Sequence, residues 1–203
     1  MMNKFEGGHR MFKHQHKKGN LIILSGPSGV GKGTILSALM NNYDDIHYSV
    51  SATTRAPRRG EEDGEDYYFM SEDKFEDLIE EEEFLEWAKV HKNYYGTPKK
   101  YVEKNLDKGE DVILEIDIQG AQQIKEKFSE GIFIFLLPPS LDELKSRIYH
   151  RGTETEEAIQ TRLKNAEKEM DKVENYDYAV VNDEIEEAIH KLEAIIIAER
   201  CKI

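Results

Sequence analysis

The chain contains a single cysteine, Cys201, among its 203 residues, so it cannot form an internal disulfide. One cysteine is typical of proteins in a reducing compartment, and we expect a cytoplasmic protein. No apolar run approaches the roughly 20 residues of a membrane-spanning helix, and the first twenty residues lack a secretory apolar stretch. These absences argue against a disulfide-bonded secreted protein and against a membrane partner.

Positive charge is also scarce, with 28 lysines and arginines against 41 acids and a net charge of −13. This balance argues against nucleic acid as the main partner, although local basic clusters can still hold small phosphorylated ligands. Residues 1–20 have the opposite charge balance, with five basic residues and Glu6 as the one acid. We expect 1–19 to be a basic flexible tail and assign it no function.

A glycine-rich loop stands between two apolar runs, Leu21–Leu24 and the helix-like Ile35–Met40. Glycines let successive backbone N–H groups turn toward an anion, and the helix that follows adds the positive end of its dipole. The pattern predicts a P-loop for the phosphates of a nucleoside triphosphate, with Lys32 as its point charge. The loop comprises Gly26, Pro27, Ser28, Gly29, Val30, Gly31, Lys32, Gly33 and Thr34.

The loop departs from the usual pattern at one position. Gly33 stands where a serine or threonine normally follows the lysine, and Thr34 comes one residue later. The hydroxyl of the usual motif is a ligand of Mg²⁺, so Thr34 is the candidate for that role here. The competing interpretation is a glycine-rich turn with an incidental lysine, which the motif glycines and both flanking runs disfavour.

Strand-like apolar runs alternate with helix-like amphipathic runs, which predicts an α/β fold with a five-stranded parallel sheet. Most strands are continuous runs of Ile, Leu, Val and Phe, as expected when helices cover both faces of the sheet. The expected core strands are Leu21–Ser25, Ile46–Val50, Val112–Ile118, Ile132–Leu137 and Tyr178–Asn182. Core helices are expected to start near Thr34, Pro98, Gln119 and Leu141, with a last one over Ile185–Arg200.

Capping residues mark two of the helix starts. Thr97 before Pro98 is typical of a helix cap followed by proline in the first turn. Ser140 with Glu143 three residues later forms a capping box.

Two segments interrupt the alternation. Residues 51–97 are polar and rich in tyrosine, with a short helix pattern at Lys74–Glu83, and they predict an inserted subdomain of short strands around one helix. Residues 147–164 carry Arg147, Arg151 and Arg162. Arginines on a mobile flap could stabilise charge in phosphoryl transfer while water is excluded, although a solvated helix explains them equally well.

Arg55 and Arg58 follow the second predicted strand, and ligands of open parallel sheets bind beyond the carboxyl ends of strands. Two arginines three residues apart can converge on one phosphate as planar donors. A solvated basic loop is the alternative. Tyrosine hydroxyls, such as those around Tyr67 and Tyr95, can also bind a phosphate while their rings pack.

Glu86 lies in an otherwise apolar tetrad, Phe84–Trp87. Its carboxylate only accepts hydrogen bonds, so it can match the adjacent N1–H and N2–H₂ donors of guanine and would meet the N1 acceptor of adenine poorly. Glu115 and Asp117 are two residues apart in a predicted buried strand, which places them on one face at its carboxyl end. Such acids imply a cation, a donor-rich ligand or an arginine nearby, with a structural ion pair as the alternative.

Over roughly residues 20–200 the chain resembles the guanylate kinase family, whose members phosphorylate GMP with ATP. The resemblance is carried jointly by Gly26–Thr34, Ser51–Arg58, Tyr94–Thr97, Asp117–Gly120 and Arg151–Thr155. It implies a P-loop kinase core, a GMP-binding subdomain and a helical lid. The implied boundaries are core 20–50, 98–137 and 165–203, GMP-binding subdomain 51–97 and lid 138–164 within a domain of 20–203.

The resemblance also implies a role for each matching residue. The P-loop residues and Asn182 would bind ATP, and the catalytic residues would be Lys32, Arg55, Arg147, Arg151 and Arg162. The GMP phosphate would be held by Arg55, Arg58, Tyr67 and Tyr95, and guanine would be read by Ser51, Glu86, Thr97 and Asp117. Thr34 and Asp117 are the candidate Mg²⁺ ligands, while Glu115 stands where some members have aspartate.

These features predict a cytoplasmic, Mg²⁺-dependent transferase that converts GMP, and dGMP, plus ATP to GDP plus ADP in guanine nucleotide supply and recycling. Monomer and homo-oligomer are both left open. One alternative is a P-loop kinase for another phosphorylated acceptor. The other is a catalytically silent, peptide-binding guanylate kinase-like module, because fold alone does not determine function.

Overall fold

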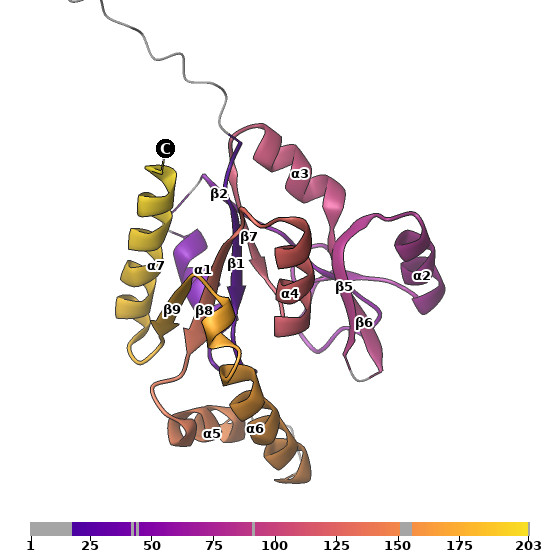
Figure 1. Ribbon diagram of the computed structural model, residues 1–203. Helices are drawn as coiled ribbons and strands as arrows, with labels where there is room; N and C mark the ends of the chain where they lie inside the picture. The colour runs from indigo at the N-terminus through magenta and orange to yellow at the C-terminus, as the bar shows by residue number, and fades with distance from the viewer. Residues whose placement is uncertain (1–17, 42, 44, 91, 151–155, 203) are drawn as a thin grey trace, which may run out of the picture.

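The computed structural model describes residues 18–202 apart from 42, 44, 91 and 151–155. Its centre is a five-stranded sheet in the order β2-β7-β1-β8-β9, and all neighbouring strands pair in parallel (Figure 1). The prediction of a five-stranded parallel sheet is therefore confirmed. The strands are β1 (Leu21–Ser25), β2 (Ile46–Tyr48), β7 (Asp111–Glu115), β8 (Ile132–Leu137) and β9 (Tyr178–Val181).

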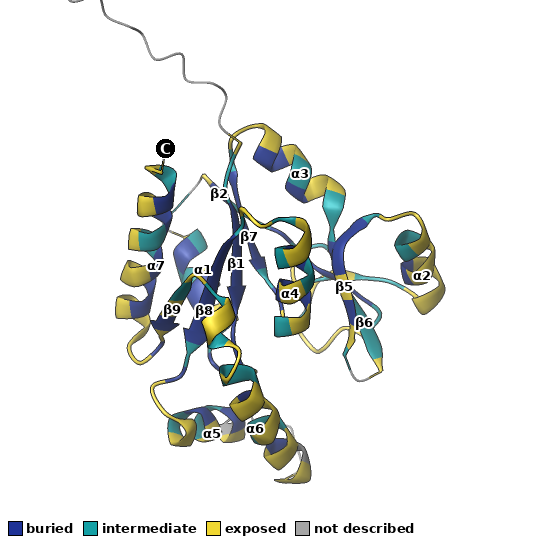
Figure 2. Ribbon diagram, in the orientation of Figure 1, coloured by how far each residue is buried: buried dark blue, intermediate teal, exposed yellow. Residues whose placement is uncertain are grey.

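Helices cover both faces of this sheet, as the continuous apolar strands require. Because successive strand residues point to opposite faces, Ile22 and Leu24 pack on one side, and Leu21 and Ile23 on the other. The first side is covered by α1 (Lys32–Met40) and α7 (Ile185–Arg200), and the second by α3 (Lys99–Asp107) and α4 (Ile118–Lys127). Figure 2 shows the resulting layers, with buried strands between helices whose outer faces are exposed.

Residues 52–98 build a second, smaller sheet in the order β4-β3-β6-β5. Helix α2 begins after Ser71, whose hydroxyl accepts a hydrogen bond from the Lys74 N–H. Its Phe75 is buried and stacks on Phe84 and Tyr94 with ring centroids 4.4 and 5.2 Å apart. The elements are β3 (Ala52–Thr53), β4 (Tyr68–Phe69), α2 (Glu72–Glu80), β5 (Phe84–Val90) and β6 (Asn93–Pro98).

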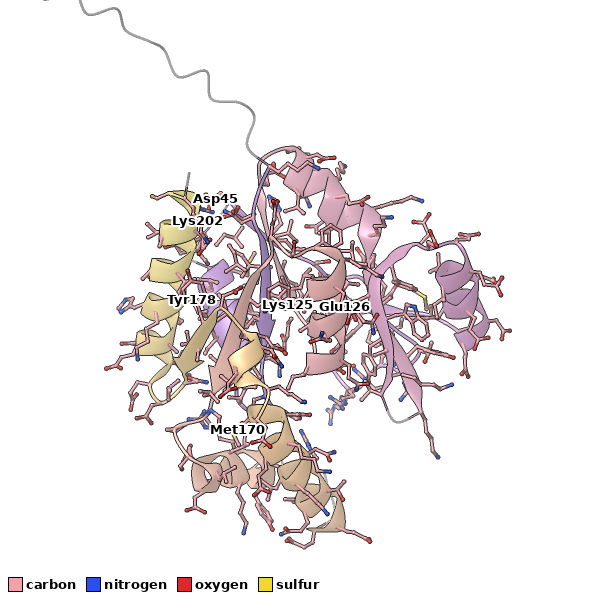
Figure 3. The ribbon with its side chains drawn as sticks, in the orientation of Figure 1. Asp45, Lys125, Glu126, Met170, Tyr178 and Lys202 are labelled. Carbon is pink, nitrogen blue, oxygen red and sulfur yellow. The ribbon has the colours of Figure 1, made fainter. Side chains whose placement is uncertain are left out.

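Two helices, α5 (Leu141–His150) and α6 (Glu156–Met170), project from the carboxyl end of the main sheet (Figure 1). They pack on each other through a small cluster that includes the buried Leu144 and Ile148. Met170, labelled in Figure 3, ends α6 at the point where the chain returns to the core. A short 3₁₀ helix, η1 (Val173–Asn175), then leads into β9. No helix in the described ranges is long and apolar enough to cross a bilayer.

The predicted strand Val112–Ile118 was wrong at its carboxyl end. Strand β7 stops at Glu115, and Asp117 is the N-cap of α4, where its Oδ1 accepts from the Gly120 N–H at 2.8 Å. The side chain of a cap residue competes for backbone donors and so starts a helix where apolar residues alone would extend a strand. Glu115 and Asp117 consequently do not share one strand face.

The predicted cap at Thr97 was also wrong. Strand β6 continues through Thr97, and α3 begins at Lys99 after Pro98, with no side-chain cap. The Thr97 hydroxyl is instead committed to a buried carboxylate. At Ser140 the cap is confirmed, because its Oγ accepts from the Glu143 N–H at 3.1 Å, although the Glu143 carboxylate pairs with Arg147 instead of returning to the cap.

The other helix and strand bounds shift by a few residues. Strand β2 stops at Tyr48, two residues before the predicted end, and β9 stops at Val181. Helix α1 begins at Lys32 instead of Thr34, and α2 covers Glu72–Glu80 instead of Lys74–Glu83. The tail predicted at 1–19 lies outside the described residues except for 18 and 19.

Candidate functional site

The P-loop connects β1 to α1 at the carboxyl end of the sheet. Its path needs glycine where φ is positive and a Cβ would collide with a neighbouring segment, as at Gly26 and Gly31. At Gly26 (φ 150°) a Cβ would lie 2.4 Å from the Leu136 carbonyl oxygen, and at Gly31 (φ 101°) it would lie 2.6 Å from Asn182 Nδ2. A side chain at either position would force this loop away from β8 or β9.

Lys32 is the first residue of α1, and its ammonium folds back over the loop. Its Nζ donates to the carbonyl oxygens of Gly26, at 2.7 Å, and Pro27, at 3.3 Å. Gly31, the N-cap of α1, brings no side-chain cap. No cap side chain therefore covers the N–H groups of the first helical turn, and this helix start suits an anion next to the Lys32 ammonium.

Helices α5 and α6 contact the P-loop and the adjacent Asn182 through arginines. Arg162 on α6 donates from Nη2 to the Ser28 hydroxyl at 2.6 Å, and Arg147 on α5 donates from Nη1 to the Asn182 carbonyl at 3.0 Å. Glu143 pairs with Arg147 Nε at 3.0 Å and aims its fork. Arg151 lies outside the described residues.

Beside Arg147 is a hollow of about 550 Å³, lined also by Gly29, Gly31, Thr34 and residues 182–186. Asn182 is 3% exposed and donates from Nδ2 to the Val30 carbonyl at 2.8 Å. Its buried Oδ1 has no hydrogen-bond partner among the described residues. A buried acceptor of this kind costs free energy until a donor reaches it.

Arg55 follows β3 and is enclosed by aromatic and acidic groups. Its guanidinium carbon lies 5.3 Å from the centroid of the Tyr67 ring, which packs against Tyr95 at 6.1 Å. The Glu61 carboxylate takes two hydrogen bonds from it, each 2.9 Å long. The bond to Arg55 lowers the pKa of Glu61 more than any other contact. Arg58, in contrast, has an exposed side chain.

Glu86 and Thr97 are directly opposite each other on the antiparallel strands β5 and β6. Glu86 is 4% exposed, and its Oε1 accepts a 2.6 Å hydrogen bond from the Thr97 hydroxyl. Burial raises the pKa of Glu86 to about 7, against the lowering effect of the Thr97 bond. A Cβ on Gly120 would lie only 2.5 Å from Glu86 Oε2, so the first turn of α4 abuts the carboxylate.

The junction between β7 and α4 connects the two halves of the site. Glu115, at the end of β7, has its Oε2 3.6 Å from where a Gly33 Cβ would be. Gly120, in the first turn of α4, touches Glu86 in the smaller sheet. Asp117 between them has an exposed side chain. One short stretch of backbone thus borders both the P-loop and the buried carboxylate.

Comparison with known proteins assigns the family. The family model for guanylate kinase matches residues 18–199. The chain belongs to the guanylate kinase family. The chain is 58% identical over 187 residues to a guanylate kinase of Caldanaerobacter subterraneus, covering 92% of this chain and 91% of that protein. It is 59% identical to one of Clostridium tetani, covering 92% and 89%.

A solved structure agrees with this assignment. The guanylate kinase of Anaplasma phagocytophilum superposes with a TM-score of 0.78 at 39% identity, covering 92% of this chain and 88% of that one. The guanylate kinase fold expected from the motifs is therefore confirmed.

The structure brings most of the predicted guanylate kinase site residues to one end of the sheet. Glu86 and Thr97 are in contact, as are Arg55 and Tyr67, and Lys32, Arg147, Arg162 and Asn182 surround the P-loop. Ser51 is 9% exposed at the start of β3, where its carbonyl accepts from the Tyr68 N–H. Arg58 and Asp117 expose their side chains.

Two acids near the guanylate kinase site were not predicted. Glu61 pairs with Arg55, and Glu169 on α6 is half-buried near the P-loop. Burial raises the pKa of Glu169, while the charge of Lys32 lowers it. Glu169 follows Arg162 by seven residues, which is two turns of α6, and this spacing on one helix is a signal that could have found it. For Glu61, the only available sequence signal was its position three residues after Arg58.

Proposed function

We propose that the chain transfers the terminal phosphoryl group of ATP to GMP, giving ADP and GDP. Membership in the guanylate kinase family is the first support. The observation that carries the proposal is the buried Glu86–Thr97 pair, which lies across the β7–α4 junction from the P-loop. A phosphate cradle alone suits many nucleotide enzymes, whereas an acceptor carboxylate beside it selects guanine.

For GMP, we propose that guanine is read by Glu86 with Ser51, Thr97 and Asp117. Ionised Glu86 would accept hydrogen bonds from N1–H and N2–H₂, and the Thr97 hydroxyl holds its Oε1 in place. The phosphate would bind to Arg55, Arg58, Tyr67 and Tyr95. dGMP differs only at the ribose 2′ position, so the same contacts suit it as an acceptor.

For ATP, we propose that the phosphates bind the P-loop residues 26–34. Lys32 would exchange its carbonyl partners, Gly26 and Pro27, for β- and γ-phosphate oxygens, a stronger charge-assisted pairing. Asn182 would border the adenine in the hollow beside Arg147, where its Oδ1 can accept from the adenine amino group.

Mg²⁺ fits this donor set as an ion that arrives with ATP. Within the described ranges, no cluster of three His, Cys, Asp or Glu side chains could hold a metal by itself. Mg²⁺ typically takes one or two protein ligands and completes its shell with phosphate oxygens and water. Thr34 and Asp117 are the predicted ligands, and Glu115 beside Gly33 is a third candidate. When bound, the ion neutralises charge on the β- and γ-phosphate oxygens.

We propose that Lys32, Arg55 and the lid arginines Arg147, Arg151 and Arg162 stabilise charge during transfer. The attacking group is an oxygen of the GMP phosphate, which is already anionic, so no dedicated general base is needed. Alignment of the two nucleotides and fixed positive charge then supply most of the rate enhancement. The single cysteine suits a cytoplasmic enzyme of guanine nucleotide supply.

The two alternatives lose support from the same geometry. A catalytically silent peptide-binding module would not need a P-loop whose Lys32 contacts the loop carbonyls and whose neighbours include Arg147 and Arg162. A kinase for another acceptor would have no evident need for a buried carboxylate at Glu86, because that group only accepts hydrogen bonds and matches the guanine donors.

The experiment that tests the proposal is an acceptor panel. ADP formation from ATP and Mg²⁺ should be fast with GMP, slower or equal with dGMP, and slow with AMP, UMP and CMP. We expect the kcat/KM for AMP to be lower by roughly 10⁴-fold, because a buried polar site rejects a ligand that leaves its groups unpaired. Equal turnover with AMP would overturn the guanine assignment, and no turnover with any acceptor would support a silent module.

A further inference from the structure

The Glu61 carboxylate is fixed from two directions. Arg55 donates to both of its oxygens, from Nη1 to Oε2 and from Nη2 to Oε1, at 2.9 Å each. The Arg58 backbone N–H donates to Oε2 at 2.6 Å, and the Glu61 N–H donates to the Arg58 carbonyl at 3.1 Å. The Arg55 and Glu61 side chains are only 14% and 18% exposed. The 58–61 turn therefore closes on itself and presents a carboxylate to Arg55.

These contacts leave one edge of the Arg55 fork for a ligand. A guanidinium has five N–H donors in one plane. Both Nη1 donors are engaged, by Glu61 and by the Ala56 carbonyl at 2.8 Å, and one Nη2 donor goes to Glu61. The rings of Tyr67 and Phe69 lie 5.3 and 5.8 Å from the guanidinium carbon. The Tyr95 side chain also interacts with the guanidinium. The edge formed by Nε–H and the second Nη2–H carries two parallel donors, which match two phosphate oxygens.

We propose that Glu61 is a positioning residue for the acceptor phosphate, holding the end of the Arg55 fork so that its Nε–Nη2 edge meets GMP. The inference rests on the proposed function, because it takes Arg55 as a phosphate ligand. It adds a residue that does not itself touch the substrate. Without Glu61, Arg55 would have to be ordered when GMP binds, at a cost in side-chain entropy.

The opposite role for Glu61 is competition, in which its carboxylate occupies the phosphate position and must leave before GMP binds. The structure favours positioning. Three donors hold Glu61, and the Arg58 N–H among them belongs to the backbone of the same turn. Displacing the carboxylate would break that turn as well as the ion pair. The lowered pKa of Glu61 agrees with a carboxylate that stays ionised and bound.

The two roles predict opposite results for Glu61→Gln, which keeps the shape and one acceptor oxygen but removes the charge. Under positioning, the KM for GMP rises roughly tenfold or more, as expected for loss of a charge-assisted contact, while the KM for ATP stays within twofold. Glu61→Asp should give a smaller rise, because it keeps the charge. Glu62→Gln is the matched control, since it removes the same charge from an exposed neighbour and should leave the KM unchanged.

Two further measurements test whether the effect of Glu61→Gln acts through Arg55 and on the phosphate of GMP. Guanosine, which lacks the phosphate, should bind Glu61→Gln and the unaltered protein equally in calorimetry. Arg55→Lys and the double variant Arg55→Lys/Glu61→Gln complete a double-mutant cycle. If Glu61 acts through Arg55, the effects of the two substitutions on the KM for GMP should be strongly non-additive. A lowered or unchanged KM for GMP in Glu61→Gln would overturn the proposal. An unaltered protein that does not turn over GMP would instead overturn the proposed function.

Discussion

At the scale of single residues, burial of Glu86 and its proposed role in base recognition have opposite requirements. It is a carboxylate inside a protein, and burial favours its neutral form and raises its pKa to about 7. The proposed guanine contact requires the ionised form, which only accepts hydrogen bonds. Near neutral pH the free protein therefore holds both forms, and we expect GMP to bind the ionised one. Burying the charge costs free energy, and under the proposed function this cost accompanies discrimination between bases.

This tension predicts a pH dependence. Because the pKa of Glu86 is raised, its ionised fraction falls about tenfold per pH unit below pH 7, and kcat/KM for GMP should fall with it between pH 8 and pH 6. The second pKa of the GMP phosphate, near 6, adds a smaller decline. Glu86→Gln removes the carboxylate and should show only that second decline, at a much lower kcat/KM. Identical pH profiles for the two proteins would contradict a titrating Glu86.

The same shift has a stability consequence with a definite sign. The folded-state pKa of Glu86 lies above the ordinary 4.5, so between pH 4.5 and 7 the folded protein binds more protons than the unfolded chain. The contribution of Glu86 to the unfolding free energy therefore declines as the pH rises through this window.

At the scale of elements, the β7–α4 junction determines where the buried Glu86 carboxylate lies relative to the P-loop. The carboxylate of Glu86 rests against Gly120 because no side chain intervenes. Asp117 caps α4 and fixes its first turn at this place. The junction is thus built from a cap and a glycine, two local features that a strand running to Ile118 would not provide.

Gly120→Ala tests this junction. A Cβ would approach Glu86 Oε2 to 2.5 Å and push the carboxylate, which Thr97 otherwise holds. We expect the KM for GMP to rise roughly tenfold and the KM for ATP to remain unchanged, because small displacements at a reacting site are costly. Steady-state kinetics with each substrate varied would measure both. Gln122→Ala, at an exposed position of α4, is the control. A variant with an unchanged KM for GMP would show that this contact is unimportant.

The sequence predicted elements well where local pattern decides. Strands β1 and β8 have the predicted bounds, Leu21–Ser25 and Ile132–Leu137, because a short apolar run between turns has few other solutions. Asp117 was misplaced because Ile116 and Ile118 continue the apolar run, and Thr97 because its partner Glu86 is 11 residues away across a hairpin. Glu61 was missed because an acid in a polar loop gives no signal until the turn closes on Arg55.

At the scale of the whole molecule, the two sheets differ in the number of buried apolar residues that pack against them. The main sheet lies between two large apolar clusters. Among the residues that the structure describes, the buried part of the smaller sheet's apolar cluster consists of Ala52, Phe75 and Phe84. Regions with few buried apolar contacts open at lower free energy than the core does. The acceptor half is therefore expected to be the softer part of the molecule, and GMP its main stabiliser.

Hydrogen exchange measures this difference. Backbone amides of α2, β3 and β6 should exchange faster than those of β1, β7 and β8 in the ligand-free protein. Saturating GMP should slow exchange in the smaller sheet, since a ligand that binds only the folded form stabilises it by about 2.7 kcal/mol at a hundred times its dissociation constant. ATP alone should leave the smaller sheet unchanged. Equal protection of both sheets without ligand would contradict this prediction.

The short stretch from Glu115 to Gly120 borders the P-loop at one end and the buried Glu86 carboxylate at the other. Under the proposed function it is a spacer of fixed length between the donor and acceptor nucleotides. Its backbone is anchored by a strand on one side and by a capped helix on the other, so the distance it spans cannot be adjusted by rotating a side chain. We expect the insertion of a single residue there to change the distance between the two proposed nucleotide sites and so to lower kcat.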